Sequence, residues 1–206
     1  MPYDPLKHGR RSIRLPSYDY SQPGAYFGTL CVADRRCIFG EIEDGEIRLS
    51  ELGAFVAEHW ASLSAHYPNV ILDEFVIMPN HVHGIIRLSS EGLPVVGAGF
   101  QPAQPPHTSK LIRSLPDIIR GFKTYTARRT TWIRGTPGQA LWQRNYYEHI
   151  VRGEGDLEAI RRYIVENPLK WAEDEENPKA VARNLVPVDD SDDDKQGRLE
   201  TRPYRY

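Results

Sequence analysis

The sequence predicts an α+β domain in which an antiparallel sheet carries its helices on one face. β-prone runs over 25–32, 70–78, 81–88 and 146–151 alternate with stretches whose apolar residues recur at helical spacing. Pro79-Asn80 separates two of these runs and predicts a hairpin. The expected order, β-α-β-β-α-β-α, contains the split βαβ arrangement of ferredoxin-like folds.

The elements of the first half follow from local signals. Residues 25–32 are β-prone, and the turn signal Asp44-Gly45 precedes a short strand over 46–49. Ser50 is a suitable N-cap for a helix over 51–66. The acidic pair Asp73-Glu74 interrupts the apolar run over 70–78. The helix carries its apolar residues at helical spacing, namely Leu52, Phe55, Val56, Trp60 and Leu63.

The second half contains two more helices and a strand. Ser114 caps a helix with Pro116 in its first turn and Asp117 three residues after the cap. Its apolar stripe comprises Leu115, Ile118, Ile119, Phe122 and Thr126. A strand is expected over 146–151. Asp156 is expected to cap a last helix over 157–167, which ends before Pro168.

Composition divides the chain into three parts. Residues 1–24 contain four prolines and are expected to be an extended, basic N-terminal arm, and residues 25–172 are expected to be the folded domain. Within that domain, the segment 89–109 is rich in proline and glycine and is expected to be a loop. Residues 173–206 are acidic, with five aspartates among the six residues 189–194, and are expected to be a disordered tail.

The overall composition excludes several protein classes. The chain has 206 residues, 40% hydrophobic and 26% charged, as in soluble globular proteins. No run approaches the ~18 apolar residues of a membrane span, and the basic N-terminus lacks the apolar segment of a secretory signal. Two cysteines, Cys31 and Cys37, cannot make a disulfide scaffold or a four-cysteine zinc site. A reduced, cytoplasmic setting is therefore expected.

The formal net charge of -2 conceals an uneven distribution. Residues 1–107 carry a net charge of -4, residues 108–172 carry +6 and residues 173–206 carry -4. Within the first part, basic residues gather in the N-terminal arm. Basic clusters on a near-neutral chain can mark a surface for a phosphate backbone, although solvated helix faces give the same pattern.

His81 and His83 form a candidate metal-binding pair. Residues i and i+2 of a strand point to the same face, so both imidazoles can converge on one ion. The alternative interpretation is two unrelated, partly buried histidines.

Tyr163 and Asn167 form a candidate catalytic pair on the last helix. At about 100° per residue, two positions four apart share a face, here at the edge of the stripe marked by Ile160 and Ile164. Two imidazoles and an amide oxygen can bind a divalent cation, and a bound cation can polarise a phosphodiester for attack by the phenol. Taken alone, Tyr163 is better explained by core packing than by catalysis.

Four segments together resemble the HUH single-strand endonucleases, and within them the small single-tyrosine transposases that include the REP-associated tyrosine transposases. The first segment, residues 75–88, reads Phe-Val-Ile-Met-Pro-Asn-His-Val-His-Gly-Ile-Ile-Arg-Leu. Residues 122–125, 141–151 and 163–168 follow in the order of the family, and the resemblance covers roughly residues 10–172.

The resemblance implies a ferredoxin-like or RRM-like catalytic domain that uses Mg²⁺ or Mn²⁺ to cleave single-stranded DNA, often near a hairpin. It implies that His81 and His83 bind the metal and that Tyr163 becomes linked to the 5′-phosphate, leaving a free 3′-OH. Asn167 falls where relatives carry a polar third ligand, often Gln, and its side chain is shorter. Both dimers and monomers occur among these relatives. Candidates for DNA contacts are the basic residues Arg10, Arg11, Arg14, Arg120, Lys123, Arg128 and Arg129.

Other interpretations remain open at this point. Tyr147, adjacent to Tyr146 and on the same strand face as His149, is a rival nucleophile or a packing residue. A histidine-triad hydrolase is excluded because position 85 is Ile. A nucleic-acid-binding or regulatory protein that uses the same scaffold without cleavage is the alternative from a different functional class.

Overall fold

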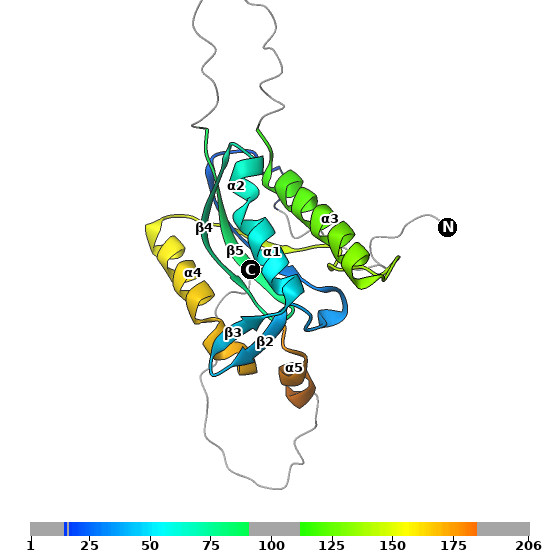
Figure 1. Cartoon of the computed structure of the whole chain (residues 1–206). Coiled ribbons are helices and arrows are strands. Elements are labelled where there is room, and N and C mark those ends of the chain that lie inside the picture. Colours follow the sequence, from blue (N-terminus) through cyan, green and yellow to red (C-terminus); the bar gives the residue numbers. More distant parts are fainter. Residues whose placement is uncertain (1–14, 16, 91–111, 185–206) are drawn as a thin grey trace, which may run out of the picture.

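The structure is a computed structural model that describes residues 15, 17–90 and 112–184. Four strands form an antiparallel sheet in the order β4-β5-β1-β6 (Figure 1). The strands are β1 (Gly24–Cys31), β4 (Val70–Ile77), β5 (His81–Leu88) and β6 (Tyr147–Ile150), and the hairpin of β2 (Gly40–Glu43) and β3 (Glu46–Leu49) forms a separate sheet. The helices are α1 (Glu51–Ala61), α2 (Leu63–His66), α3 (Leu115–Arg134), α4 (Glu154–Glu166) and α5 (Pro178–Asn184), with short 3₁₀ helices η1 (Ala33–Arg35) and η3 (Pro168–Glu173).

This architecture confirms the predicted α+β class. With the hairpin set aside, the strands occur in the spatial order second, third, first, fourth, which is the order of a ferredoxin-like sheet. The interruption expected at Asp73-Glu74 is an irregularity in the β4–β5 register between Leu72 and Phe75. None of the helices in the described ranges has a sufficiently long apolar stretch to span a lipid bilayer.

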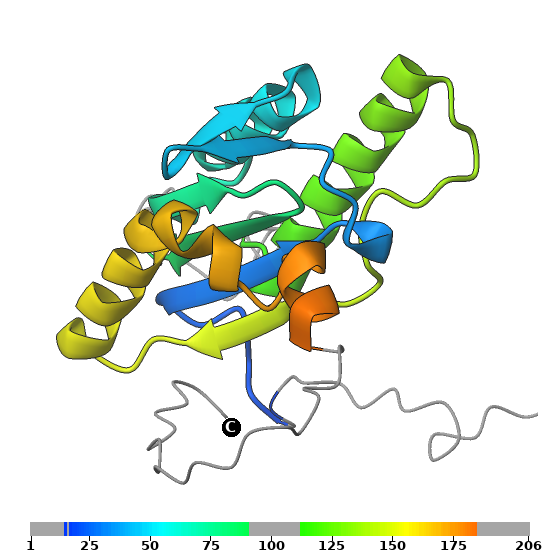
Figure 2. The same cartoon turned by 90° about the horizontal axis from the view of Figure 1, so that it is seen from below.

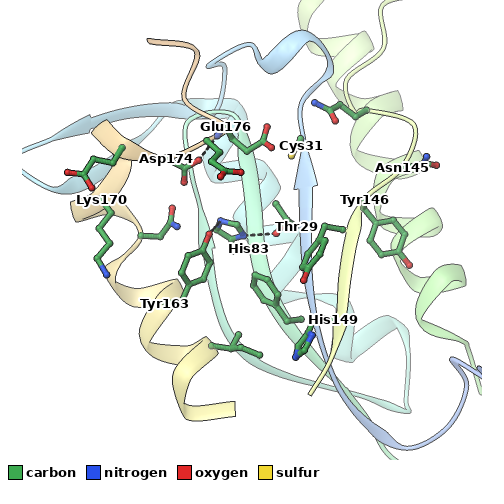
Figure 3. A pocket seen from close by; sticks show the side chains of 17 residues that line it. Thr29, Cys31, His83, Asn145, Tyr146, His149, Tyr163, Lys170, Asp174 and Glu176 are labelled. Carbon is green, nitrogen blue, oxygen red and sulfur yellow. Dashed lines mark hydrogen bonds between the residues drawn. The ribbon is translucent and has the colours of Figure 1, made fainter. Parts of the chain in front are cut away.

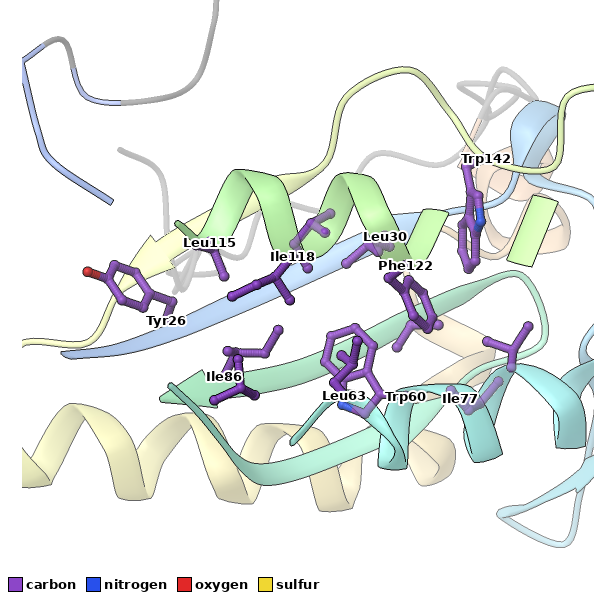
Figure 4. Packing of buried hydrophobic residues seen from close by; sticks show 14 of the residues in the cluster. Tyr26, Leu30, Trp60, Leu63, Ile77, Ile86, Leu115, Ile118, Phe122 and Trp142 are labelled. Carbon is purple, nitrogen blue, oxygen red and sulfur yellow. The ribbon is translucent and has the colours of Figure 1, made fainter. Parts of the chain in front are cut away.

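One face of the sheet carries the main core. Trp60 of α1 and Phe122 of α3 pack edge to face at 5.2 Å above Leu30 and Ile86, which project from the same side of β1 and β5 (Figure 4). Gly84 on β5 makes this close packing possible, because a Cβ there would lie 2.9 Å from Cε2 of Trp60. Two of the three predicted caps form, since Oγ of Ser50 accepts a hydrogen bond from Gly53 N and Oγ of Ser114 accepts one from Asp117 N.

The prediction that all helices share one face is wrong for α4. Leu157, Ile160 and Ile164 of α4 pack on Phe27 and Ile85, which point to the opposite side of the sheet from the main core. Figures 1 and 2 show α4 set apart from α1 and α3. Strand alternation is the physical reason, since the odd-numbered side chains of β1 and β5 include the apolar Ala25, Phe27 and Ile85, which require a cover.

Several boundaries differ from the sequence prediction. The predicted helix over 51–66 is divided at Ser62 into α1 and α2, and strand β2 has no counterpart among the predicted elements. Helix α4 starts at Glu154 after Gly153 as N-cap, so Asp156 is not the cap. Its carboxylate instead accepts hydrogen bonds from Arg152 N and from His149 Nε2, both at 2.9 Å.

Both ends of the folded domain extend beyond the predicted limits. Residues 173–184, placed in the disordered tail by composition, include the end of η3 and all of α5. At the other end, Tyr20 is buried against Tyr26, so the end of the predicted arm packs on the domain. Most of the predicted loop over 89–109 and residues Arg10, Arg11 and Arg14 lie outside the described part.

An ion pair fastens α4 to β4. Arg161 donates two hydrogen bonds of 2.7 Å to the two carboxylate oxygens of Asp73, whose side chain is 9% exposed. The Arg161 guanidinium holds the pKa of the Asp73 carboxyl below its ordinary value. The stabilisation is therefore fully present above the unfolded pKa of about 3.9 and is lost as the pH falls through the lowered folded value.

We expect Asp73→Asn to lower the melting temperature at neutral pH, because the charge-assisted pair is lost. The difference in melting temperature between the variant and the parent protein should shrink as the pH falls below about 4, because Asp73 of the parent then becomes protonated and loses its charge. Thermal melts followed by circular dichroism between neutral pH and about pH 2 measure this. A difference that stays constant over the whole range would contradict the pair's contribution. Glu158→Gln, at a partner of Arg161 that is more exposed than Asp73, is the matched control.

Candidate functional site

The two histidines of β5 converge as predicted. His81 and His83 are 0% and 3% exposed and project from the face of the sheet that carries α4. Their Nε2 atoms lie 2.9 Å apart, and the rings meet edge to face at 4.4 Å. Burial lowers the pKa of His81 well below its ordinary value and lowers that of His83 to about 3. Both imidazoles are therefore neutral at physiological pH, which is the form that binds metals.

Asn80 fixes the orientation of His81. Its Nδ2 donates to the backbone carbonyls of Arg35 (3.0 Å) and Glu176 (2.7 Å), which directs its Oδ1 towards Nδ1 of His81 at 2.9 Å. A carboxamide oxygen only accepts, so Nδ1 of His81 carries the proton and Nε2 presents a lone pair. This arrangement is the outer-shell hydrogen bond that orients metal-binding histidines in proteins.

Thr29 on β1 supports His83 in the same way. The two residues are register partners, and Oγ1 of Thr29 lies 2.9 Å from Nδ1 of His83 (Figure 3). A hydroxyl can donate or accept, so it suits either tautomer of His83. His83 can therefore direct a lone pair or a proton at Nε2 towards its neighbours.

Helix α4 brings Tyr163 to this pair. The phenol oxygen of Tyr163 lies 3.3 Å from Nε2 of His83, and the two rings meet at 5.1 Å. Tyr163 is 40% exposed, so a large substrate can reach it. Burial of the hydroxyl, with a smaller contribution from the charge of Asp174, raises the pKa of Tyr163 to about 12. The phenol is consequently neutral and needs activation to act as a nucleophile.

Asn167, at the C-terminal end of α4, completes the predicted set. It is 2% exposed, and its amide lies close enough to Tyr163 and Asp174 to lower the pKa of both groups by hydrogen bonding, although burial and neighbouring charges leave both values raised. Its Oδ1 is buried without a hydrogen-bond partner. A buried, unpaired carboxamide oxygen is costly unless a donor or a cation meets it.

The structure adds a carboxylate that the sequence interpretation assigned to the tail. Asp174 follows η3, its side chain is 8% exposed, and its Oδ2 lies 3.9 Å from Nε2 of His81. Ligand atoms of His81, His83 and Asp174 all lie within 4.8 Å of one another. Two neutral imidazoles, a carboxylate and a nearby amide oxygen are a donor set that can hold a metal ion, so the residues fit a divalent cation.

Asp174 belongs to a segment that we call the C-terminal strap, residues 168–184. Arg35 and Asn80 hold this strap in place next to Asp174. Arg35 donates from Nη1 to the carbonyl of Glu175 at 2.9 Å and pairs through Nε with Oε2 of Glu176 at 3.2 Å. Asn80 binds the carbonyl of Glu176 and also orients His81. Asn80 thus orients the imidazole of His81 and also holds the strap that carries the carboxylate of Asp174.

A cavity of about 830 Å³ opens beside these groups (Figure 3). One end is lined by His83, Tyr163, Asn167 and the strap, and the other by residues of β1 and β6. Tyr147, the rival nucleophile, lines the β6 end and is 42% exposed. The tyrosine whose hydroxyl contacts His83 is Tyr163. Tyr147 instead lies opposite Thr29 in the β1–β6 register.

The basic residues predicted to contact DNA do not gather at this cavity. Arg120, Lys123, Arg128 and Arg129 lie on α3, which packs on the opposite face of the sheet. Arg120 is paired with Asp117, and the guanidinium of Arg129 lies over the ring of Trp132 at 4.3 Å. Nζ of Lys123 contacts the carbonyls of Gln143, Arg144 and Asn145 at 2.6, 3.3 and 3.3 Å, which anchors the segment that leads into β6.

Comparisons with known proteins agree with this fold. No family model matches the chain. An uncharacterized protein of Haemophilus influenzae is 41% identical over 174 residues, which cover 82% of this chain and 93% of that protein. A second protein of the same organism, named "Putative REP-associated tyrosine transposase", is 24% identical over 74% of each chain.

A solved structure of a REP-associated tyrosine transposase bound to a REP hairpin has a similar fold. The TM-score is 0.51 at 19% identity, over 95% of this chain and 100% of that chain. The chain therefore belongs to one family with the Haemophilus influenzae protein that is 41% identical to it, and its resemblance in sequence and fold is to the REP-associated tyrosine transposases.

Proposed function

We propose that this protein is a metal-dependent single-stranded DNA endonuclease and strand transferase of the transposase type. The observation that carries the proposal is the contact between the phenol of Tyr163 and a buried pair of neutral histidines beside an open cavity. A protein that only binds DNA needs neither the buried pair nor a tyrosine directed at it.

His81, His83 and Asp174 would hold Mg²⁺ or Mn²⁺, with the unpaired oxygen of Asn167 as a further ligand. When bound, the ion polarises the scissile phosphate and offsets the weak nucleophilicity of a neutral phenol. Asn80 and Thr29 keep the two imidazoles in position.

Tyr163 attacks the phosphorus from the exposed rim of the cavity. A bond forms between the phenol oxygen and the 5′-phosphate, and the bond to the 3′ oxygen breaks. The phenol loses its proton and the 3′ oxygen gains one, which leaves a free 3′-OH. The substrate that we propose is a hairpin-forming single strand of the REP type, in line with the hairpin in the related structure.

The test is a covalent-adduct assay with the full chain. Labelled hairpins with single-stranded flanks, drawn from the genome around the gene, are incubated with Mn²⁺ and separated on denaturing gels. We expect a protein–DNA band that requires the metal and disappears with EDTA. A chain that binds these hairpins but gives no band with any of them would favour the binding-only alternative.

A further inference from the structure

The end of the cavity away from Tyr163 is an aromatic surface. Tyr147 and His149 alternate along the edge strand β6 and project from the same face as their register partners Thr29 and Phe27. Tyr147 is 42% exposed although it lines a cavity, so a ligand in the cavity can reach it.

Phe27 connects this surface to the candidate catalytic residues. Its ring is stacked beside that of His83 at 5.5 Å and meets the rings of Tyr163 and Tyr147 edge to face at 6.0 and 6.3 Å. Adjacent strands lie about 4.8 Å apart, so β6 is two spacings, roughly 10 Å, from β5. Tyr147 therefore lies about two strand spacings from His83, on the same face of the sheet.

The surface is held rigidly. His149 Nε2 lies 2.9 Å from the carboxylate of Asp156, which also accepts a hydrogen bond from Arg152 N. The start of the strand is anchored through Lys123, whose ammonium contacts the carbonyl of Asn145. A fixed ring loses little conformational freedom when a ligand stacks on it.

Charge indicates which part of a nucleotide fits here. The cavity's acidic residues, from Glu173 to Glu176, and its Lys170 belong to the strap. The β6 end is lined by Phe27, Asn145, Tyr146, Tyr147 and His149, and none of these residues belongs to the acidic strap. An aromatic surface outside the acidic strap suits a base, whereas a phosphate requires cationic partners.

We propose that the β6 end of the cavity is a subsite for an unpaired nucleobase, which stacks on Tyr147 next to the phosphate that Tyr163 attacks. The subsite rests on the proposed function. Stacking on sheet aromatics is how RRM-like surfaces hold single strands, and a base paired in a duplex has no free face to offer. The subsite thus selects single-stranded DNA at the point of cleavage. In this role Tyr147 binds the base through its ring and not through its hydroxyl.

The experiment measures binding separately from cleavage. Fluorescence anisotropy compares labelled oligo-dT with a strand of the same length made of abasic nucleotides, on a Tyr163→Phe background that cannot form the adduct. We expect Tyr147→Ala to weaken oligo-dT binding roughly 5- to 150-fold, the usual loss for one stacking aromatic, and to leave abasic-strand binding unchanged. Tyr147→Phe should bind oligo-dT as the background protein does.

Tyr125→Ala is the matched control, since Tyr125 is an exposed tyrosine of α3 on the opposite face. If Tyr147→Ala fails to fold by circular dichroism, Tyr147→Leu removes the ring while keeping apolar volume. The subsite is overturned if the folded non-aromatic variant binds oligo-dT normally, or if Tyr147→Phe binds it as weakly as that variant. Absence of an adduct from the protein with Tyr163 intact overturns the proposed function instead, because the oligo-dT comparison does not depend on cleavage.

Discussion

Tyr163→Phe is expected to remove the covalent protein–DNA band down to the background of the gel. The phenol oxygen is the atom that would bond to phosphorus, and phenylalanine lacks it while keeping the ring. Of the hydroxyl's neighbours, His83 lies at 3.3 Å, outside ideal hydrogen-bond length, and the residue is 40% exposed. The substitution should therefore leave the melting temperature nearly unchanged, and hairpin binding should persist without cleavage.

Tyr147→Phe is the matched control, because Tyr147 lines the same cavity and has a similar exposure. It should form the covalent band at a rate comparable with that of the parent protein. A band that survives Tyr163→Phe and disappears with Tyr147→Phe would assign the nucleophile to β6. That outcome would also contradict the stacking role of Tyr147.

The sheet and the histidine pair were predictable because their signals are local. Strand alternation alone places His81 and His83 on one face, and the 3.6-residue period places Tyr163 and Asn167 together at the end of a helix. The caps Ser50 and Ser114 are short-range signals of the same kind. Each of these inferences depends on residues within four positions of one another.

The residues that the sequence interpretation missed act over long separations. Asp174 stands in an acidic stretch whose composition resembles that of a disordered tail, and its place beside His81 depends on contacts with Arg35 and Asn80. Thr29 supports His83 from a strand 54 positions away in the chain. Asn80 directly precedes His81, and a carboxamide next to a candidate metal ligand is the one signal that could have been used.

Charge counts along the sequence also could not show which basic side chains already have partners within the protein. The segment 108–172 is basic, yet Lys123 contacts three backbone carbonyls and Arg120 pairs with Asp117. Composition records the charge of a side chain and not its partners. Contacts between α3 and DNA therefore stay a prediction, and any such contacts lie on the face of the sheet opposite the cavity.

The second large effect is expected on metal binding. His83→Ala should lower Mn²⁺ affinity below detection by calorimetry, because it removes one of two converging imidazoles. Asp174→Asn should weaken binding by a smaller but clear factor, since it removes the negative charge and keeps the side-chain shape. His66→Ala, on α2 and away from the cavity, is the matched control and should bind Mn²⁺ as the parent does.

Arg35→Ala extends the same measurement to the C-terminal strap. Arg35 holds the backbone at Glu175 and the side chain of Glu176, next to Asp174. Loss of such an outer contact typically costs roughly 10- to 100-fold in metal affinity, so a loss in that range is expected without any change in the ligands themselves. Melting temperatures separate this effect from unfolding. If Asp174→Asn and Arg35→Ala both bind Mn²⁺ normally while Asn167→Ala does not, the oxygen ligand comes from α4 and the strap has no part in holding the ion.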